Sequence, residues 1–281
     1  MTSETFVAGA KFRTLSENSV SLIPGRSNQK FLRKMKSYQS LADDYYVNLN
    51  LGTEMELPSN RETVLHFFEQ LQKNYPEMRN FYSRDKRDFV LEEDKDRGSH
   101  RWCTVEPRRV SSGFVNPENI EDAIEQHRRV LEIAPYALSM SPLDCEALDL
   151  LLGFDFSYRG NQNQLVAEAL GICPAMEGLG ALPGATIINH EPNLTIALDD
   201  ECRLQCRLSV EARTNAYQIR TGDFQEDQLS VYVTARHYGS LQSGETYPEV
   251  LARLEQVCVK VIDNYVVEAI LHPLARAIAL G

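Results

Sequence analysis

The sequence lacks the short motifs that mark the commonest catalytic and cofactor sites. It has no G-x-S-x-G turn for a nucleophilic serine, no H-E-x-x-H zinc pair, no Walker A loop and no G-x-G-x-x-G dinucleotide loop. The six cysteines form no C-x-x-C pair, and no second His or Cys pair accompanies His190 and Glu191 at a metal-ligand spacing. We therefore expect no metal and no cofactor, and these absences argue against an enzyme.

Long apolar runs are missing as well. No stretch of about 18 apolar residues exists, which predicts that no segment spans a membrane. The first twenty residues contain no basic segment followed by an apolar one, so we expect no export and a cytoplasmic location. In that compartment the cysteines at positions 103, 145, 173, 202, 206 and 258 are expected to be reduced and mostly buried.

Basic residues are outnumbered by acidic ones outside the first forty positions. The chain has a formal net charge of −11, and residues 1–38 carry seven basic side chains against Glu4 and Glu17. That segment is therefore at +5, which leaves −16 for residues 39–281. An acidic body repels phosphates over roughly a Debye length, about 10 Å. The charge distribution therefore argues against binding of nucleic acid.

The basic N-terminal arm, residues 1–40, has little hydrophobic periodicity before the stretch "NQKFLRKMKSY" and is expected to be partly flexible. Residues 28–38 are predicted to form a short docking helix, because Phe31, Leu32 and Met35 share one helical face. We expect this helix to dock on an acidic surface, either of the body or of a protein partner. The predicted docking residues are Lys30, Phe31, Arg33, Lys34 and Met35.

The body has the composition of a globular protein, with 43% apolar and 25% charged residues. In residues 41–170, an alternating strand in "YYVNLNLGTEM" precedes a helix with the capping box Ser59 and Glu62, and then two strands joined by "DKDRGS". A helix capped by Asn116, with Pro117 in its first turn, precedes a central strand in "CEALDLLLGFDFSY". This order predicts a ferredoxin-like (βαββαβ) α+β domain.

The stretch "FDFSYRGNQNQLVAEALG" has the strand, glycine turn and helix start of a phosphate-binding loop. Such loops usually need more than one glycine and a following Lys, Ser or Thr, and this turn has neither. We therefore interpret Gly160 as a turn residue and Asn161 as the cap of a short helix that ends before Gly171.

The second half of the chain has a different pattern. Residues 171–184 hold four glycines and two prolines and are predicted to be a linker. Residues 185–281 then alternate between apolar and polar positions, as successive antiparallel strands do when one face is covered and one is wet. The predicted cover is a long helix that starts at the capping box Thr246 and Glu249, which Pro273 should kink or stop. The fold class is therefore α+β, with a ferredoxin-like domain followed by an antiparallel sheet covered by this helix.

Few side chains of the body stand out as candidates for chemistry. His127 lies on an apolar helix stripe, which is more typical of a buried histidine than of a catalytic one. Glu211, Arg213 and Arg236 fall on the wet face of the second sheet, and with His237 they form the candidate ligand-binding set. Converging Arg and Glu side chains either hold an anionic ligand or form solvated ion pairs, and both alternatives stay open.

Two stretches carry a family resemblance. "LSVEART", "TGD" and "LSVYVTARHYG" before a long C-terminal helix, together with "PLDCEALDLLLGFDFSYRGN", resemble a sporadically distributed family of uncharacterised bacterial two-domain α+β proteins. The resemblance covers most of residues 44–272. It implies a bacterial cytoplasmic protein without an established activity, so it identifies no catalytic residue.

Two hypotheses about function follow. The first is a non-enzymatic binding or assembly module that interacts with a protein partner and forms a homodimer, because ferredoxin-like sheets and long helices leave apolar surface that dimers commonly cover. The alternative is a small anionic-ligand-binding protein, or an enzyme, that uses a cleft between the two domains.

Overall fold

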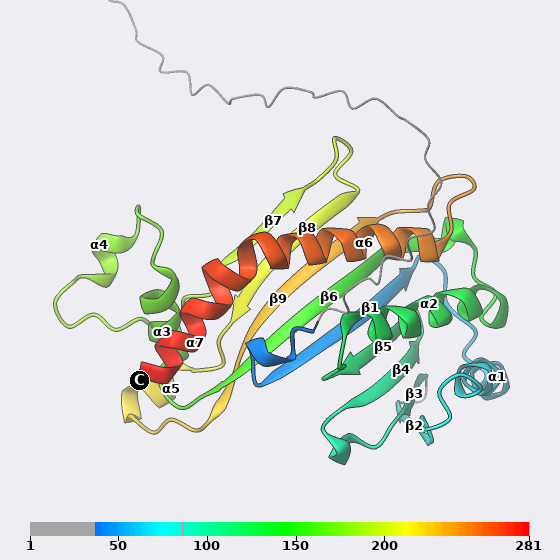
Figure 1. Ribbon diagram of the computed structural model, residues 1–281, viewed down its shortest axis with the longest axis horizontal. Helices are drawn as coiled ribbons and strands as arrows, with labels where there is room; N and C mark the ends of the chain where they lie inside the picture. The colour runs from blue at the N-terminus through cyan, green and yellow to red at the C-terminus, as the bar shows by residue number, and fades with distance from the viewer. Residues whose placement is uncertain (1–36, 86, 281) are drawn as a thin grey trace, which may run out of the picture. The chain divides into compact units, whose positions relative to one another are not determined.

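The computed structural model describes residues 37–85 and 87–280. In this part of the chain, nine strands form one antiparallel sheet in the order β2-β3-β4-β5-β1-β6-β9-β8-β7, and helices lie across one face of it (Figure 1). This confirms the predicted α+β class. The predicted docking residues lie outside the described residues: Lys30, Phe31, Arg33, Lys34 and Met35.

The strands are, in chain order, β1 (Asp44–Thr53), β2 (Asn80–Asp85), β3 (Asp88–Glu92), β4 (His100–Glu106), β5 (Arg109–Val115), β6 (Cys145–Tyr158), β7 (Asn193–Ala197), β8 (Leu204–Glu211) and β9 (Asp227–Tyr238). The α-helices are α1 (Arg61–Gln72), α2 (Ile120–Ala137), α3 (Gln162–Leu170), α4 (Glu177–Gly180), α5 (Ala216–Thr221), α6 (Tyr247–Val261) and α7 (His272–Leu280). The 3-10 helices are η1 (Gln39–Leu41), η2 (Lys95–Arg97) and η3 (Pro142–Asp144), and the π-helix η4 (Ile262–Leu271) joins α6 to α7. Within the described residues, no helix has both the length and the apolar character that crossing a bilayer requires.

Strand β1 shows how the sequence pattern places the core. Its side chains alternate in burial, so Val47, Leu49 and Leu51 are fully buried on one face while Asn48 and Asn50 point to the other. Helix α2 packs against β1 and β5, and α6 packs against β6 and β9. The predicted half-buried strand is confirmed, and the core lies between the sheet and these helices.

Between α1 and α2 the chain forms four strands where the sequence predicts two. The additional strands are β2 and β5. Strand β2 is an exposed edge, and β5, with the sequence RVSSGFV, is buried largely through small residues. Neither strand has the apolar alternation on which strand prediction depends. The element order therefore differs from the predicted βαββαβ order.

Two predicted helix starts are confirmed. Helix α6 has the capping box of Thr246 and Glu249. In α3 the side-chain oxygen of Asn161 accepts hydrogen bonds from the backbone N–H groups of Asn163 and Gln164. The turn before α3 is therefore explained by helix capping, as the sequence analysis expects.

Two other helix starts differ from the prediction. The N-cap of α1 is Asn60 instead of Ser59, and the N-cap of α2 is Asn119 instead of Asn116. Asn116 adopts a positive φ of 49°, and its side-chain oxygen accepts a hydrogen bond of 2.9 Å from the backbone N–H of Tyr45. Asn116 therefore joins the loop before α2 to the first strand, and the helix begins one turn later.

The segment predicted to be a linker, residues 171–184, is largely exposed and contains the short helix α4. Strand β6 precedes this segment and β9 follows it, yet the two strands pair over twelve residue pairs. The parts of the chain expected to form two domains therefore share one sheet. Between β8 and β9 the chain forms the helix α5, where the sequence predicts strands and turns.

The C-terminal helix runs from α6 through η4 into α7 and bends on the way (Figure 1). It does not stop at Pro273, since α7 continues to Leu280. The buried side chains Ile262, Val266 and Leu271 are separated by steps of four and then five residues. Because π-helical hydrogen bonds span five residues, η4 keeps this uneven stripe turned towards the hydrophobic core.

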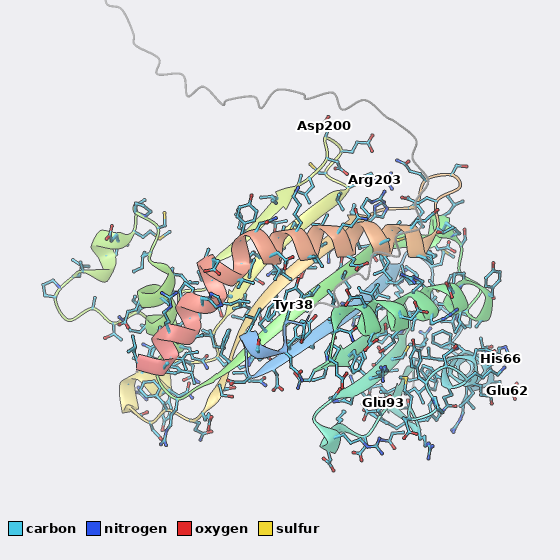
Figure 2. All side chains as sticks on the ribbon, viewed as in Figure 1. Tyr38, Glu62, His66, Glu93, Asp200 and Arg203 are labelled. Atoms are coloured by element: carbon cyan, nitrogen blue, oxygen red, sulfur yellow. The ribbon has the colours of Figure 1, made fainter. Side chains whose placement is uncertain are left out.

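The first described residues are anchored beneath this helix. Tyr38 is 5% exposed and lies between α2 and the C-terminal helix (Figure 2). Its ring lies 5.8 Å from that of Tyr45 and 6.2 Å from that of Phe154, and its hydroxyl donates a hydrogen bond of 2.8 Å to Asp263. The chain therefore enters the body on the helix-covered side of the sheet.

Candidate binding face of the sheet

The face of the sheet that points away from α2 and α6 is polar. Two neighbouring rows of side chains cross it in register, and we call the surface that they form the polar face. The first row is Thr104, Ser111, Asn50, Asp149, Arg236 and Gln205. The second row is Trp102, Gly113, Asn48, Leu151, Thr234, Arg207 and Thr195.

Two aromatic rings on this side of the sheet lie over glycines. A methyl group at Gly113 would overlap the ring of Trp102, and one at Gly153 would overlap the ring of Tyr46. Glycine in a strand allows this close approach of a ring to the backbone. The ring of Tyr46 also lies 6.4 Å from that of Tyr232 on β9. The rings of Trp102 and Tyr46 therefore lie directly against the backbone of the sheet.

Three hollows open on the polar face, with volumes of about 540, 360 and 290 Å³. Asn50, near the middle of β1, lines all three. We name them, in the same order, the Arg109 hollow, the Trp102 hollow and the Arg207 hollow. Because they meet at one residue, they form one broad and continuous surface.

The Arg207 hollow carries an excess of positive charge. Arg236 donates hydrogen bonds of 2.7 and 2.6 Å to the carboxylate of Asp149, which raises the pKa of the guanidinium and neutralises this pair. Arg207 donates a hydrogen bond of 3.2 Å to the amide oxygen of Asn193, and it has no carboxylate partner among the described residues. Further hydrogen-bonding side chains line the hollow: Asn50, Thr195, Gln205 and Thr234. This arrangement can hold a carboxylate or a phosphate.

Around Trp102, three polar atoms are buried without a hydrogen-bond partner in the described part of the chain. They are the hydroxyl oxygen of Thr104, the ring nitrogen Nδ1 of His100 and the amide oxygen of Asn48. Burial, with a smaller contribution from Lys95, lowers the pKa of His100, so its ring is neutral at pH 7. Buried polar atoms without partners are costly. They therefore favour a ligand that supplies hydrogen bonds.

The four residues of the predicted ligand-binding set do not converge. Of these, only Arg236 lines the hollows around Asn50. Glu211 lies opposite Ser230, six residues along β9 from Arg236, or about 20 Å at 3.3 Å per residue. Arg213 contacts the same end, with a hydrogen bond of 3.2 Å to the hydroxyl of Ser230. His237 points to the opposite face of the sheet, because it directly follows Arg236 in the strand.

His237 lines a separate hollow of about 420 Å³, together with residues of the turn between β7 and β8. Figure 2 shows Asp200 and Arg203 at this end of the molecule. The guanidinium of Arg203 donates hydrogen bonds to the backbone oxygens of Tyr238, the last residue of β9, and of Ser240. Arg253 forms an ion pair of 2.7 Å with Glu245. Burial first, and then Arg203, lowers the pKa of His237. Both arginines that line this hollow are therefore already bound to groups of the protein, which argues against an anion site here.

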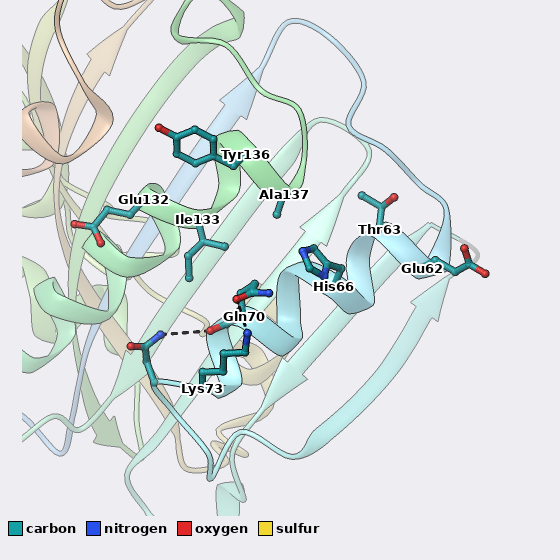
Figure 3. Close-up of a pocket in the computed structure, with 10 residues that line it drawn as sticks. Glu62, Thr63, His66, Gln70, Lys73, Glu132, Ile133, Tyr136 and Ala137 are labelled. Carbon is teal, nitrogen blue, oxygen red and sulfur yellow. Dashed lines mark hydrogen bonds between the residues drawn. The ribbon is translucent and has the colours of Figure 1, made fainter.

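A groove of about 860 Å³ lies between α1 and α2 (Figure 3). His66 on α1 and Lys73, just after the end of α1, line this groove. Tyr136, which is 89% exposed, lies at its rim on α2. The ammonium of Lys73 donates a hydrogen bond of 2.9 Å to the side chain of Gln70. None of the buried unpartnered polar atoms of the described residues lines this groove. The groove is therefore a weaker candidate for a binding site than the polar face.

A serine–histidine pair lies inside the core. The hydroxyl oxygen of Ser112 and Nδ1 of His127 are 2.7 Å apart, and both residues are 0% exposed. Burial lowers the pKa of His127 to about 3, so the ring is neutral. A catalytic nucleophile must reach a substrate, and this pair cannot. The prediction that His127 is buried is confirmed.

Apart from Arg236, the structure assembles the polar face from residues that the sequence analysis does not single out. Arg207 belongs to a strand predicted to have a wet face, but Asn50 and Trp102 come from other strands, and strand order cannot be read from alternation alone. The available signal is the pair Asn48 and Asn50, which alternates with apolar residues in β1. Among the described residues, no three His, Cys, Asp or Glu side chains are placed to hold a metal ion.

Comparisons of the chain with protein-family models, with curated proteins and with solved structures give no match. The resemblance to a bacterial two-domain family therefore stays a prediction. Any statement about function has to be argued from the polar face itself.

Proposed function

We propose that this protein is a non-enzymatic binding module that docks a protein partner on the polar face of its sheet. The observation that carries the proposal is that three hollows meet at Asn50 on β1. Together their lining residues extend from β2 to β7 in the spatial order of the sheet. A broad surface of several joined hollows suits a protein partner, whereas small substrates usually bind in one enclosed pocket.

The residue types on this side of the sheet support a protein partner. Trp, Tyr and Arg side chains contribute most of the binding energy in many interfaces, and Trp102, Tyr46, Arg207 and Arg236 lie here. The two aromatic rings rest on glycines, and Asp149 orients Arg236. Side chains that are ordered before binding lose less conformational entropy when a partner docks.

The excess positive charge of the Arg207 hollow favours a second candidate, the binding of a small anion. Arg207 is a cation without a carboxylate partner among the described residues, in a chain with a net charge of −11. Titration of inorganic phosphate or acetate should then perturb the amide NMR signals of β8 and β9, and the change Arg207→Gln should abolish the effect. An equal response in the variant would reject this candidate.

Site-specific photo-crosslinking tests the proposed protein partner. A photoreactive amino acid is placed at Thr234 on the polar face or, as a control, at the exposed Arg129 on α2. In cells that naturally express the protein, we expect one partner, different from this chain, to be captured from position 234 and not from position 129.

The change Arg207→Glu should reduce that capture at least tenfold, because it reverses the excess positive charge of the Arg207 hollow. Arg129→Glu is the charge-matched control and should leave capture unchanged. Recovery of the same proteins from both positions, or capture that Arg207→Glu leaves intact, would contradict the proposal. The crosslinked partner must also bind the purified chain with the same dependence on Arg207.

The ferredoxin-like arrangement also remains a proposal. It is supported by the spatial order β4-β5-β1-β6, if β2 and β3 are taken as a hairpin added to one edge. The bacterial and cytoplasmic origin stays an implication of the family resemblance.

A further inference from the structure

Strand β7 forms one edge of the sheet (Figure 1). Along its outer side, its backbone groups form no hydrogen bond with other described residues. Two hydrogen bonds to β8 set the pattern: Leu198 donates its N–H to Leu204, and Val210 donates its N–H to Pro192. Because bonded pairs alternate in an antiparallel ladder, Leu194 and Ile196 also bond to β8. The outward N–H and C=O groups are those of Asn193, Thr195 and Ala197.

The opposite edge of the sheet is protected against pairing with another chain. Strand β2 carries the charged residues Arg84 and Asp85, and its register with β3 is broken between Ser83 and Asp85. Charges and irregularities are common ways in which proteins block edge strands. Strand β7, with the sequence NLTIA, has no charged residue and a regular register with β8.

The side chains of β7 are also unusually exposed for apolar residues. Leu194 is 64% exposed and Ile196 is 44% exposed. They pair with Leu208 and Cys206, whose side of the sheet is the one that α6 covers. Helix α6 packs on β6 and β9 and does not reach this edge (Figure 1). The edge therefore presents both unpaired backbone groups and apolar side chains.

We propose that β7 pairs with β7 of a second copy of this chain, antiparallel about a two-fold axis through Thr195. The register that uses all three outward residues places Thr195 opposite Thr195 of the second copy, and Asn193 opposite Ala197. The same register places Leu194 beside Ile196 of the second copy. The strand is thus complementary to itself in backbone and in side chains, which selects a second copy as the occupant.

Charge sets the conditions for this association. Two copies of the chain repel each other, because each carries a net charge of −11. Strand β7 has no charged residue, so the two β7 strands can approach each other without direct charge repulsion. Raising the salt concentration from 0.1 to 1 M shortens the Debye length from about 10 to about 3 Å. Added salt therefore strengthens this dimer, whereas it would weaken an interface made of ion pairs.

Cysteine crosslinking tests the register. In a background without the exposed thiols, Cys173→Ser and Cys202→Ser, the change Thr195→Cys places two thiols across the two-fold axis. The Cα atoms of such a pair lie about 5.5 Å apart, within the range of a disulfide. The change Ala197→Cys is the control, because its copies are four residues out of register and about 13 Å apart.

Under mild oxidation we expect a disulfide-linked dimer from Thr195→Cys and little from Ala197→Cys. Crosslinking at both positions or at neither would overturn the proposal. As a second measurement, light scattering of the full chain should show a mass that rises towards two chains with concentration and with salt.

The change Leu194→Lys with Ile196→Lys should remove the concentration dependence, because it places like charges opposite each other. The control Leu179→Lys with Leu182→Lys, at exposed apolar residues of the α4 segment, should keep it. A monomer at all concentrations in the unmodified chain would contradict the proposal. Circular dichroism of each variant verifies that loss of the dimer is not loss of the fold.

Discussion

At the scale of single residues, glycines determine where an aromatic ring can lie against the polar face. Gly113 and Gly153 admit the rings of Trp102 and Tyr46 to the surface of the sheet. Gly52 on β1 has no aromatic ring against it. The nearest atom to a methyl group added there would be 3.6 Å away. The three glycines therefore have similar backbones and different roles.

We expect Gly113→Ala to lower the free energy of unfolding by about 1–3 kcal/mol, because the added methyl group overlaps the ring of Trp102. Gly52→Ala should change it by less than about 1 kcal/mol. Urea unfolding of the two variants measures the difference. Equal stability would show that the ring of Trp102 does not rest on the backbone.

His127 should make the protein lose stability as the pH falls. Its pKa is about 3 in the folded chain and near 6.5 when exposed, so below pH 6.5 the unfolded state binds a proton that the folded state does not. Stability is fully present above pH 6.5 and falls by about 1.4 kcal/mol per pH unit between the two pKa values, towards pH 3. The change His127→Gln should reduce the slope measured between pH 6.5 and 4.5.

The control for this measurement is His66→Gln, which alters an exposed side chain on α1. His100 and His237 also have lowered pKa values, so part of the slope remains in every variant. Identical slopes for His127→Gln and the unmodified chain would refute the assignment.

At the scale of elements, the C-terminal helix decides which part of the sheet is covered. Helix α6 packs on β6 and β9, and η4 keeps Ile262, Val266 and Leu271 on the core despite their uneven spacing. The same placement leaves β7 uncovered. The position of one helix thus separates the core of the molecule from its proposed dimer edge.

The start of this helix is stabilised by its capping box. The carboxylate of Glu249 accepts a hydrogen bond of 2.8 Å from the backbone N–H of Thr246. Thr246→Ala should lower the free energy of unfolding by about 1 kcal/mol, whereas Thr246→Ser should be nearly neutral because the hydroxyl remains. Thermal unfolding of the two variants compares them, and a Ser variant as unstable as the Ala variant would exclude capping as the cause.

At the scale of the whole molecule, β6 and β9 connect the two parts of the chain that the sequence separates at residues 171–184. They pair over twelve residue pairs, and their side chains contact the same helix α6. Because β6 and β9 are paired along their length, unfolding the part of the chain before residues 171–184 would expose the core of the part after them, and the reverse. We therefore expect one cooperative unfolding transition for the described body.

Leu152 tests this expectation, because it is 0% exposed in β6 and pairs with Val47 on one side and Val233 on the other. Leu152→Ala should cost about 2–5 kcal/mol and should increase amide exchange in β1 and in β8 together. If β8 kept its protection while β1 lost it, the two parts would be separate folding units, as the sequence analysis predicts.

Local patterns in the sequence were sufficient for much of the secondary structure. The alternation of Val47, Leu49 and Leu51 predicts β1, and Thr246 and Glu249 predict the start of α6, because both signals depend on neighbours within a few residues. The same reasoning failed for β5, whose small residues are buried by contacts from distant elements.

The candidate site, in contrast, depends on which strands become neighbours. Sequence alone determined that Asn50 and Arg236 lie on polar strand faces, since side-chain direction follows from a period of two residues. Only the tertiary structure decided that β1, β6 and β9 are adjacent and that their polar faces form one surface. Strand order is set by long-range backbone pairing and by the helices that bury the other face, and neither leaves a local signal in the chain.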